Sequence, residues 1–120
     1  MHIMKQLKKF LFVAIIVTSF SFISFHHGWA DYDQTKIIDY TGEVESFSSG
    51  NPHTTAKVKD GKKTWLVILA PASRMSARGV PTDKIVEGSK IRVYGYPHKK
   101  EKNEMRAERI FVDDVKYELR

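Results

Sequence analysis

The chain has 120 residues, no cysteine and a formal net charge of +6. This length allows one domain, and the absence of cysteine excludes a disulfide scaffold and thiolate metal sites. Beyond residue 30 the chain holds 17 Lys and Arg against 14 Asp and Glu, a balance of +3. Such a mixed surface differs from the concentrated basic stripe of a nucleic-acid-binding protein, which makes a nucleic-acid partner unexpected.

The first 30 residues have the pattern of a secretory signal peptide. A basic start up to Lys9 is followed by an unbroken apolar run, Phe10 to Val17, and then by Ser, Thr and Phe as far as Phe25. These are the n-region and h-region of a signal, and the stretch is shorter than the roughly 20 residues of a membrane-spanning helix. We therefore expect export to the periplasm or the medium, with membrane contact only through an uncleaved signal.

The cleavage position is open between residues 21 and 30. Small residues occupy the two positions that signal peptidase recognises in Gly28-Trp29-Ala30 and also in Ser19-Phe20-Ser21. The first cut removes His26 and His27, whereas the second keeps them. The predicted organisation is a signal over residues 1–30 and a single β domain over residues 31–120.

Turn signals follow in this domain at intervals that suit short strands. Residues 37–47 alternate in polarity, which places Ile38, Tyr40, Val44 and Ser46 on one face. Gly42 interrupts the alternation and marks a bulge or a bend at a barrel corner. After a loop over 48–52, strands at 53–59 and 63–70 are expected to form a hairpin across Asp60-Gly61.

The second half of the domain combines one helix with three further strands. Pro71 and Gly79 bound the short helix, and a weaker turn covers 82–86. Strands are expected over 90–96, 105–112 and 115–119. In the first of them Ile91 and Val93 face one side, opposite Arg92, Tyr94 and Tyr96. One core should be formed by the following residues: Val44, Trp65, Val67, Ile91, Val93 and Ile110.

This order of elements, β-β-β-α-β-β with a short extra C-terminal strand, predicts a mostly β fold. A long, bent first strand and a helix between the third and fourth strands are typical of a small five-stranded Greek-key barrel of the OB kind. A three-layer α+β sandwich is the alternative.

Several short motifs resemble a family of small exported bacterial proteins that is catalogued only as a domain of unknown function. The similar segments are His26-His27-Gly28-Trp29-Ala30-Asp31-Tyr32-Asp33, Thr41-Gly42-Glu43-Val44, Asn51-Pro52-His53, Arg78-Gly79 and 87–96. The resemblance covers roughly residues 26–120 and implies no activity. It also implies that the histidine pair opens the mature chain, although the usual small-residue cleavage site does not precede it here.

Three histidines in these motifs suggest a transition-metal site. Neutral imidazoles on an exported protein suit Cu, Zn or Ni, so His26, His27 and His53 are the candidate ligands. Neighbouring residues of a strand point to opposite sides, so only one of the pair would join His53. A cut after Ser24 would instead leave a free amine two residues before His27, a start that can surround Cu(II) or Ni(II). The alternative is that the pair belongs to the signal and that His53 only begins a strand.

Catalysis is not expected, because the chain has no cysteine nucleophile, no Gly-x-Ser-x-Gly turn, no phosphate-binding glycine loop and no His-Glu-x-x-His pair. A recognition surface is a second possibility. OB barrels bind ligands with cations and aromatic rings, and the candidates here are Lys57, Lys59, Arg92, Tyr94 and Tyr96, with Trp65 assigned to the core.

The sequence thus predicts a periplasmic, non-catalytic binding module. In one version it binds Cu or Zn through its histidines. In the other it is an adaptor, or a domain that binds a small ligand or peptide, and uses no metal; its partner is then an unidentified periplasmic protein, peptide or small ligand.

Overall fold

The computed structural model describes residues 27–50 and 52–120. Residues 27–31 belong to one unit of the chain and residues 32–120 to a second. The described part of the first unit holds a short helix, α2 (His27–Ala30). Most of the predicted signal peptide lies outside the described residues, and within them no helix is long and apolar enough to cross a membrane.

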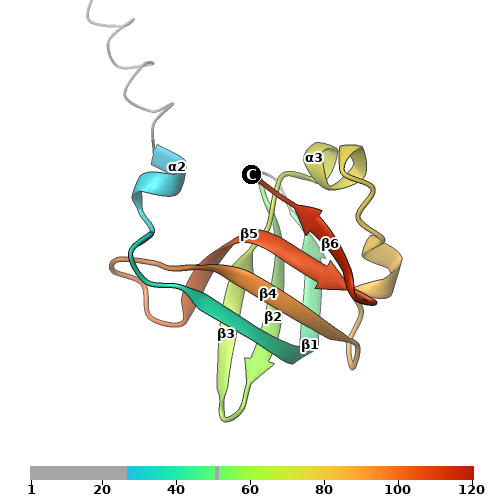
Figure 1. The fold of residues 1–120 in the computed structure, drawn as a ribbon, viewed down its shortest axis with the longest axis horizontal. Helices are drawn as coiled ribbons and strands as arrows, with labels where there is room; N and C mark the ends of the chain where they lie inside the picture. The colour runs from blue at the N-terminus through green and yellow to red at the C-terminus, as the bar shows by residue number, and fades with distance from the viewer. Residues whose placement is uncertain (1–26, 51) are drawn as a thin grey trace, which may run out of the picture. The chain divides into compact units, whose positions relative to one another are not determined.

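The second unit is a barrel of antiparallel strands closed by one parallel pairing (Figure 1). Its elements are β1 (Ile38–Ser49), β2 (Thr54–Asp60), β3 (Lys63–Ile68), α3 (Ala72–Ala77), the 3₁₀ turn η1 (Thr82–Lys84), β4 (Lys90–Pro97), β5 (Glu104–Val112) and β6 (Val115–Glu118). The strand order is β3-β2-β1-β4-β5, and parallel pairing of β3 with β5 closes this ring. β6 pairs with the second half of β5 outside the ring. The predicted OB-like barrel with an extra C-terminal strand is confirmed.

The long first strand, β1, pairs with two different strands along its length. Its first half pairs with β4 and its second half with β2, so the strand must bend between them. At Gly42 an added Cβ would overlap the carbonyl oxygen of Lys59 on β2. The predicted corner at this glycine is therefore a place where two backbones approach too closely for a side chain.

A bulge in β1 corrects the predicted inner face of that strand. Val44 pairs with Val58 and Ser46 with Lys57, so Glu45 is the extra residue. One extra residue reverses which later side chains point inward. In consequence Ser46 is exposed, although it was expected on the apolar face, and Phe47 packs against the core instead.

Two tight turns connect neighbouring strands, and each contains residues with positive φ. Gly61, with φ of 61°, is the first central residue of the β2–β3 turn, as in a type II′ hairpin. Asp113 and Asp114, with φ of 50° and 64°, form the whole β5–β6 turn, as in type I′. Asn-Gly and Asp-Gly are the usual pairs there, so an aspartate in place of the glycine is the uncommon feature.

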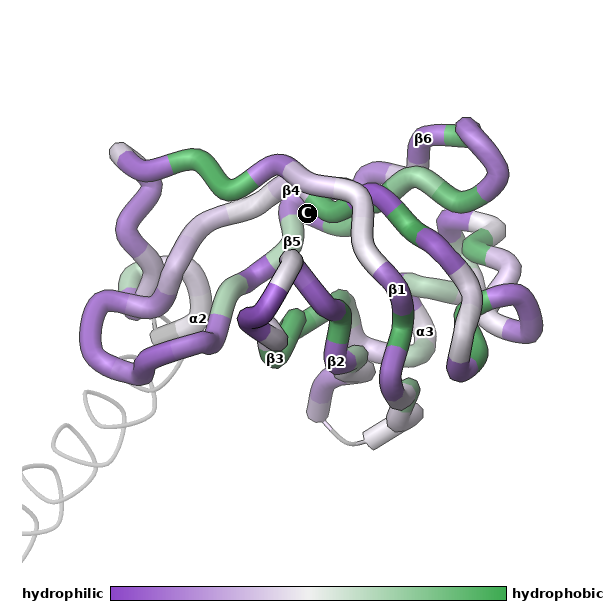
Figure 2. The backbone as a smooth tube through the Cα atoms, turned by 90° about the horizontal axis from the view of Figure 1, so that it is seen from below, coloured by the Kyte–Doolittle hydropathy of each residue, from purple (hydrophilic) through white to green (hydrophobic). Residues whose placement is uncertain are grey.

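The core lies inside the barrel, and the strands show the alternation of hydrophobic and hydrophilic residues that this requires (Figure 2). Five of the six predicted core residues are buried in one cluster: Val44, Val67, Ile91, Val93 and Ile110. Trp65 is only partly buried and packs against this cluster, while the Lys63 ammonium lies 3.7 Å from the centre of its ring. Met75, the buried residue of α3, joins the helix to the same core.

Candidate functional site

The predicted ligand surface is divided by the fold into two parts. Lys57 and Lys59 are exposed on β2, whereas Arg92 and Tyr94 lie on the outer face of β4. β1 runs between these two strands, and the side chains have different partners, since Lys59 pairs with Glu45 whereas Arg92 pairs with Asp39. The two lysines on β2 and the two residues on β4 must therefore be considered as separate surfaces.

Tyr96 differs from the prediction because it is buried, with 9% of its surface exposed. The pairing of β4 with β5 shifts by one residue between Tyr94 and Gly95, where Glu108 of β5 is the extra residue. The alternation of β4 itself continues, and the ring of Tyr96 lies 6.3 Å from that of Tyr94 on the same face. The Tyr96 hydroxyl donates a hydrogen bond of 2.9 Å to Glu108. Burial, followed by this carboxylate, raises the pKa of Tyr96, so the residue is part of the packing and not of a binding platform.

On the outer face of β4, charged and aromatic side chains are held in fixed pairs. Arg92 donates two hydrogen bonds of 2.8 Å to Asp39 on β1, and its guanidinium lies 4.5 Å from the centre of the Phe111 ring. The bond from Arg92 is the main cause of the lowered pKa of Asp39. Arg109 of β5 is stacked on Tyr94 in the same way, with 4.5 Å between guanidinium and ring centre. Each exposed pair contributes little stability, but together they fix where these side chains stand.

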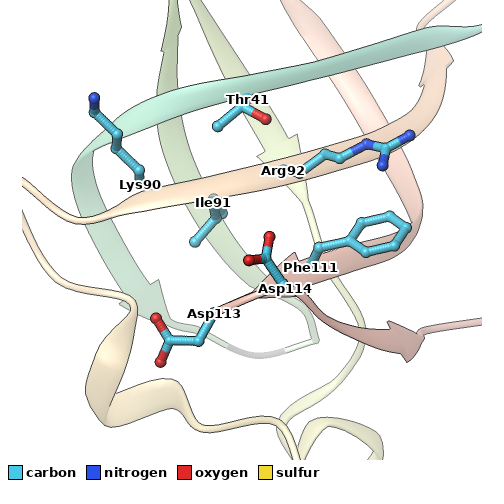
Figure 3. Close-up of a pocket in the computed structure, with 7 residues that line it drawn as sticks. All are labelled: Thr41, Lys90, Ile91, Arg92, Phe111, Asp113 and Asp114. Atoms are coloured by element: carbon cyan, nitrogen blue, oxygen red, sulfur yellow. The ribbon is translucent and has the colours of Figure 1, made fainter.

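Beside these pairs lies a pocket of about 350 Å³ (Figure 3). Its lining comes from β1, β4, the end of β5 and the β5–β6 turn: Thr41, Lys90, Ile91, Arg92, Phe111, Asp113 and Asp114. The volume is at the lower end of the range of about 300–1,000 Å³ for small-molecule sites. Four charged side chains line this hollow, and Figure 3 shows the ends of Lys90 and Asp113 directed away from Asp114. This lining makes it the strongest candidate binding site of the barrel.

The β5–β6 turn determines how the two aspartates take part in this pocket. Figure 3 shows the carboxylate of Asp114 directed toward β4 and that of Asp113 directed away from it. Asp113 accepts a hydrogen bond of 2.9 Å from the ammonium group of Lys84, the last residue of η1. The uncommon positive φ angles of the turn thus aim one carboxylate at η1 and the other at the pocket.

Of the pocket lining, sequence reasoning identified Arg92 as a ligand contact and missed the other charged residues. Lys90 was interpreted only as the start of a strand, and Asp113-Asp114 only as a connection. The one local signal was the pair of aspartates at a two-residue hairpin turn, a place where Asn-Gly or Asp-Gly is usual.

The candidate metal ligands lie only partly within the described residues. His26 is outside them, and so is the side chain of His27, whose backbone belongs to α2. His53 is partly exposed just before β2, and its Nε2 lies 3.4 Å from Nη2 of Arg106. Burial, followed by the charges of Arg106 and Arg74, lowers the pKa of His53, so its imidazole is held neutral.

The imidazole of the remaining described histidine, His98, is hydrogen-bonded to the backbone. Its Nδ1 accepts hydrogen bonds of 3.0 Å and 2.8 Å from the amides of Lys100 and Glu101. Within residues 27–50 and 52–120 no group of three or more His, Asp or Glu residues is placed to hold a metal ion. A site that used His26 or the side chain of His27 would include groups that the structure does not describe.

Comparison with known proteins places residues 14–106 in one family. The sequence of these residues matches the model of a family described as a family of unknown function (DUF6152). This confirms the resemblance to a family catalogued as a domain of unknown function. No curated protein matches the chain.

Proposed function

The chain belongs to this family of unknown function, and we propose that it is an exported, non-catalytic binding module whose ligand occupies the pocket beside β4. The observation that carries this proposal is the pocket itself, where a hollow of about 350 Å³ is lined by two cations, two carboxylates and an aromatic ring. A few polar groups converging on a concave site are the usual features of a small-molecule site. The basic and apolar N-terminal pattern supports export.

The chemistry of the lining favours binding over catalysis. Thr41 supplies its only hydroxyl, and among the described lining residues there is no histidine to act as a base. The two carboxylates have different surroundings, because Asp113 is paired with Lys84 and Asp114 faces the pocket. Such groups can orient a ligand, but a nucleophile with an adjacent base is not assembled by this lining.

We expect small polar molecules to bind at this pocket and not at the lysines of β2. The test is an amide chemical-shift titration of the ¹⁵N-labelled full chain, in mild detergent, with a panel of amino acids, short carboxylates, amines and monosaccharides. Supporting shifts would concentrate at Thr41, Ile91, Phe111 and Asp114. Shifts confined to the surface around Lys57 and Lys59, or no shifts with any compound, would contradict the proposed site.

A transition-metal role is the second candidate, and the state of His53 favours it. Only a neutral imidazole can ligate a metal, and the lowered pKa keeps His53 neutral to a lower pH than an ordinary histidine. The Arg106 guanidinium at 3.4 Å faces Nε2, so ligation would use Nδ1 or require this arginine to move. The remaining ligands would be His26 or His27.

If this second role is correct, one Cu(II) or Zn(II) should bind per chain in calorimetry at neutral pH. Replacing His26 and His53 together by alanine should weaken binding more than His98→Ala, because His98 already bonds to the backbone. Affinity should fall as the pH drops below about 6.5, since protonation of an ordinary histidine removes a ligand. No heat above that of a histidine-free variant, or an exported protein that begins at Asp31, would argue against the metal.

A further inference from the structure

The pocket beside β4 contains one cation and one anion that remain available for a ligand. Lys90 and Asp114 line it, and neither makes an ion pair within the described part of the chain. The other two charges are already matched, because Arg92 is bonded to Asp39 and Asp113 to Lys84. The pocket therefore has two unmatched charges of opposite sign.

Two further polar groups of the lining can still form hydrogen bonds. Arg92 uses Nε and Nη2 for Asp39, and a guanidinium has five N–H donors in a fixed fork. Its Nη1 accordingly keeps its donors, since it makes no hydrogen bond to any described residue. Among the same residues the hydroxyl of Thr41 also has no hydrogen-bond partner. These groups lie on β1 and β4, on the side of the pocket opposite the turn that carries Asp114 (Figure 3).

A ligand with a single charge would satisfy only half of this arrangement. An anion would pair with Lys90 and meet the Asp114 carboxylate, while a cation would pair with Asp114 and meet Lys90. A molecule that carries both charges pairs with both, and charge-assisted hydrogen bonds are the strong ones in such sites. The modest volume also favours a compact molecule.

We propose, on the basis of the function proposed above, that the pocket binds a small zwitterion of the amino-acid type. Its ammonium group pairs with the carboxylate of Asp114. Its carboxylate is held by Nη1 of Arg92 and by the Lys90 ammonium, whose flexible side chain points away from Arg92 in Figure 3 and turns toward the pocket when the ligand binds. The Phe111 ring and the Lys90 methylenes cover its apolar part. Arg92 is suited to this role because Asp39 and Phe111 already hold its guanidinium in place.

The test compares zwitterions with analogues that lack one charge. The ¹⁵N-labelled full chain is titrated with alanine, β-alanine and 4-aminobutyrate, and with the N-acetyl and carboxamide forms of each. We expect at least one zwitterion to bind at the pocket at least about fivefold more tightly than both of its blocked forms. Equal affinity for a zwitterion and its blocked forms across all three series would overturn the proposal.

Two substitutions assign the charges to residues. Asp114→Asn should reduce the affinity for the zwitterion to that for its N-acetyl form, whereas Asp60→Asn, in the turn of the other hairpin, should leave it unchanged. Lys90→Gln should weaken the N-acetyl forms and spare the carboxamides. This variant also provides the test if Asp114→Asn does not fold. An unchanged preference for the zwitterion in Asp114→Asn or in Lys90→Gln would overturn the assignment.

The outcome also separates this inference from the proposed function. Shifts at the pocket from other compounds, with no preference for zwitterions, would overturn the inference and leave the binding module in place. An absence of shifts at the pocket with every compound would overturn both.

Discussion

Gly42→Val should destabilise the barrel by about 3 kcal/mol, at the upper end of the usual cost of overpacking. A Cβ at this position would overlap the carbonyl oxygen of Lys59 and lie 3.0 Å from its carbonyl carbon. Backbone atoms of a neighbouring strand cannot move aside as the end of a flexible side chain can. Valine is favoured in strands, so any loss of stability would come from this contact and not from the local preference of the residue.

Gly50→Val is the matched control, because Gly50 is exposed beyond the end of β1. A Cβ there would meet only the carbonyl oxygen of His53, at 3.3 Å, and the expected cost is less than about 1 kcal/mol. Urea unfolding of the two variants and the parent gives the comparison. Equal stability of the two variants would remove the argument for a sharply bent first strand.

A second close approach of two backbones occurs at Gly95. At Gly95 of β4 an added Cβ would overlap the carbonyl oxygen of Arg106 on β5. Gly42 and Gly95 thus lie on adjacent strands at places where a neighbouring backbone comes very near. The sequence indicated the first glycine through an interrupted alternation, but Gly95 stands between two tyrosines and gave no such signal.

The order and type of the elements could be predicted from local patterns, because each pattern has a local cause. Gly61 supplies the positive φ of the β2–β3 turn. Pro71 and Gly79 flank α3, and Gly79 has the positive φ that commonly follows a helix end. These features depend on a few neighbouring residues, so one sequence is sufficient to recognise them.

Two side chains could not be placed from alternation alone, because their surroundings depend on how the strands pair. The extra residue Glu45 turns Phe47 inward. Tyr96 keeps the face of Tyr94 but is buried there, and its hydroxyl bonds to Glu108, the extra residue of β5. Neither the bulge nor this burial has a signature in its own strand. A ligand surface predicted by strict alternation therefore included Tyr96, and it joined the lysines of β2 to the residues of β4 as if they formed one surface.

The candidate pocket required tertiary structure for a similar reason. Lys90 begins β4 and Asp114 ends the β5–β6 turn, and only the pairing of β4 with β5 brings them to one hollow. Their separation in sequence carries no pattern that a motif could capture. The uncommon backbone of the aspartate turn was the one feature that sequence reasoning could have questioned.

Val67→Ala should cost about 1–3 kcal/mol, because the residue is fully buried at the place where the barrel closes. Val67 pairs with Ala56 of β2 on one side and with Met105 of β5 on the other. Loss of its two methyl groups leaves a cavity among strands that are fixed on both sides and cannot collapse to fill it. The free energy gained by burying the two methyl groups is then lost, and no rearrangement of the neighbouring side chains restores it.

The control for this change is Val115→Ala, since Val115 begins β6 outside the ring and is 51% exposed. It should alter stability by less than about 0.5 kcal/mol. The free energies of unfolding in urea distinguish the two positions under one protocol. Should Val67→Ala match the parent within error, the assignment of Val67 to the barrel core would be wrong.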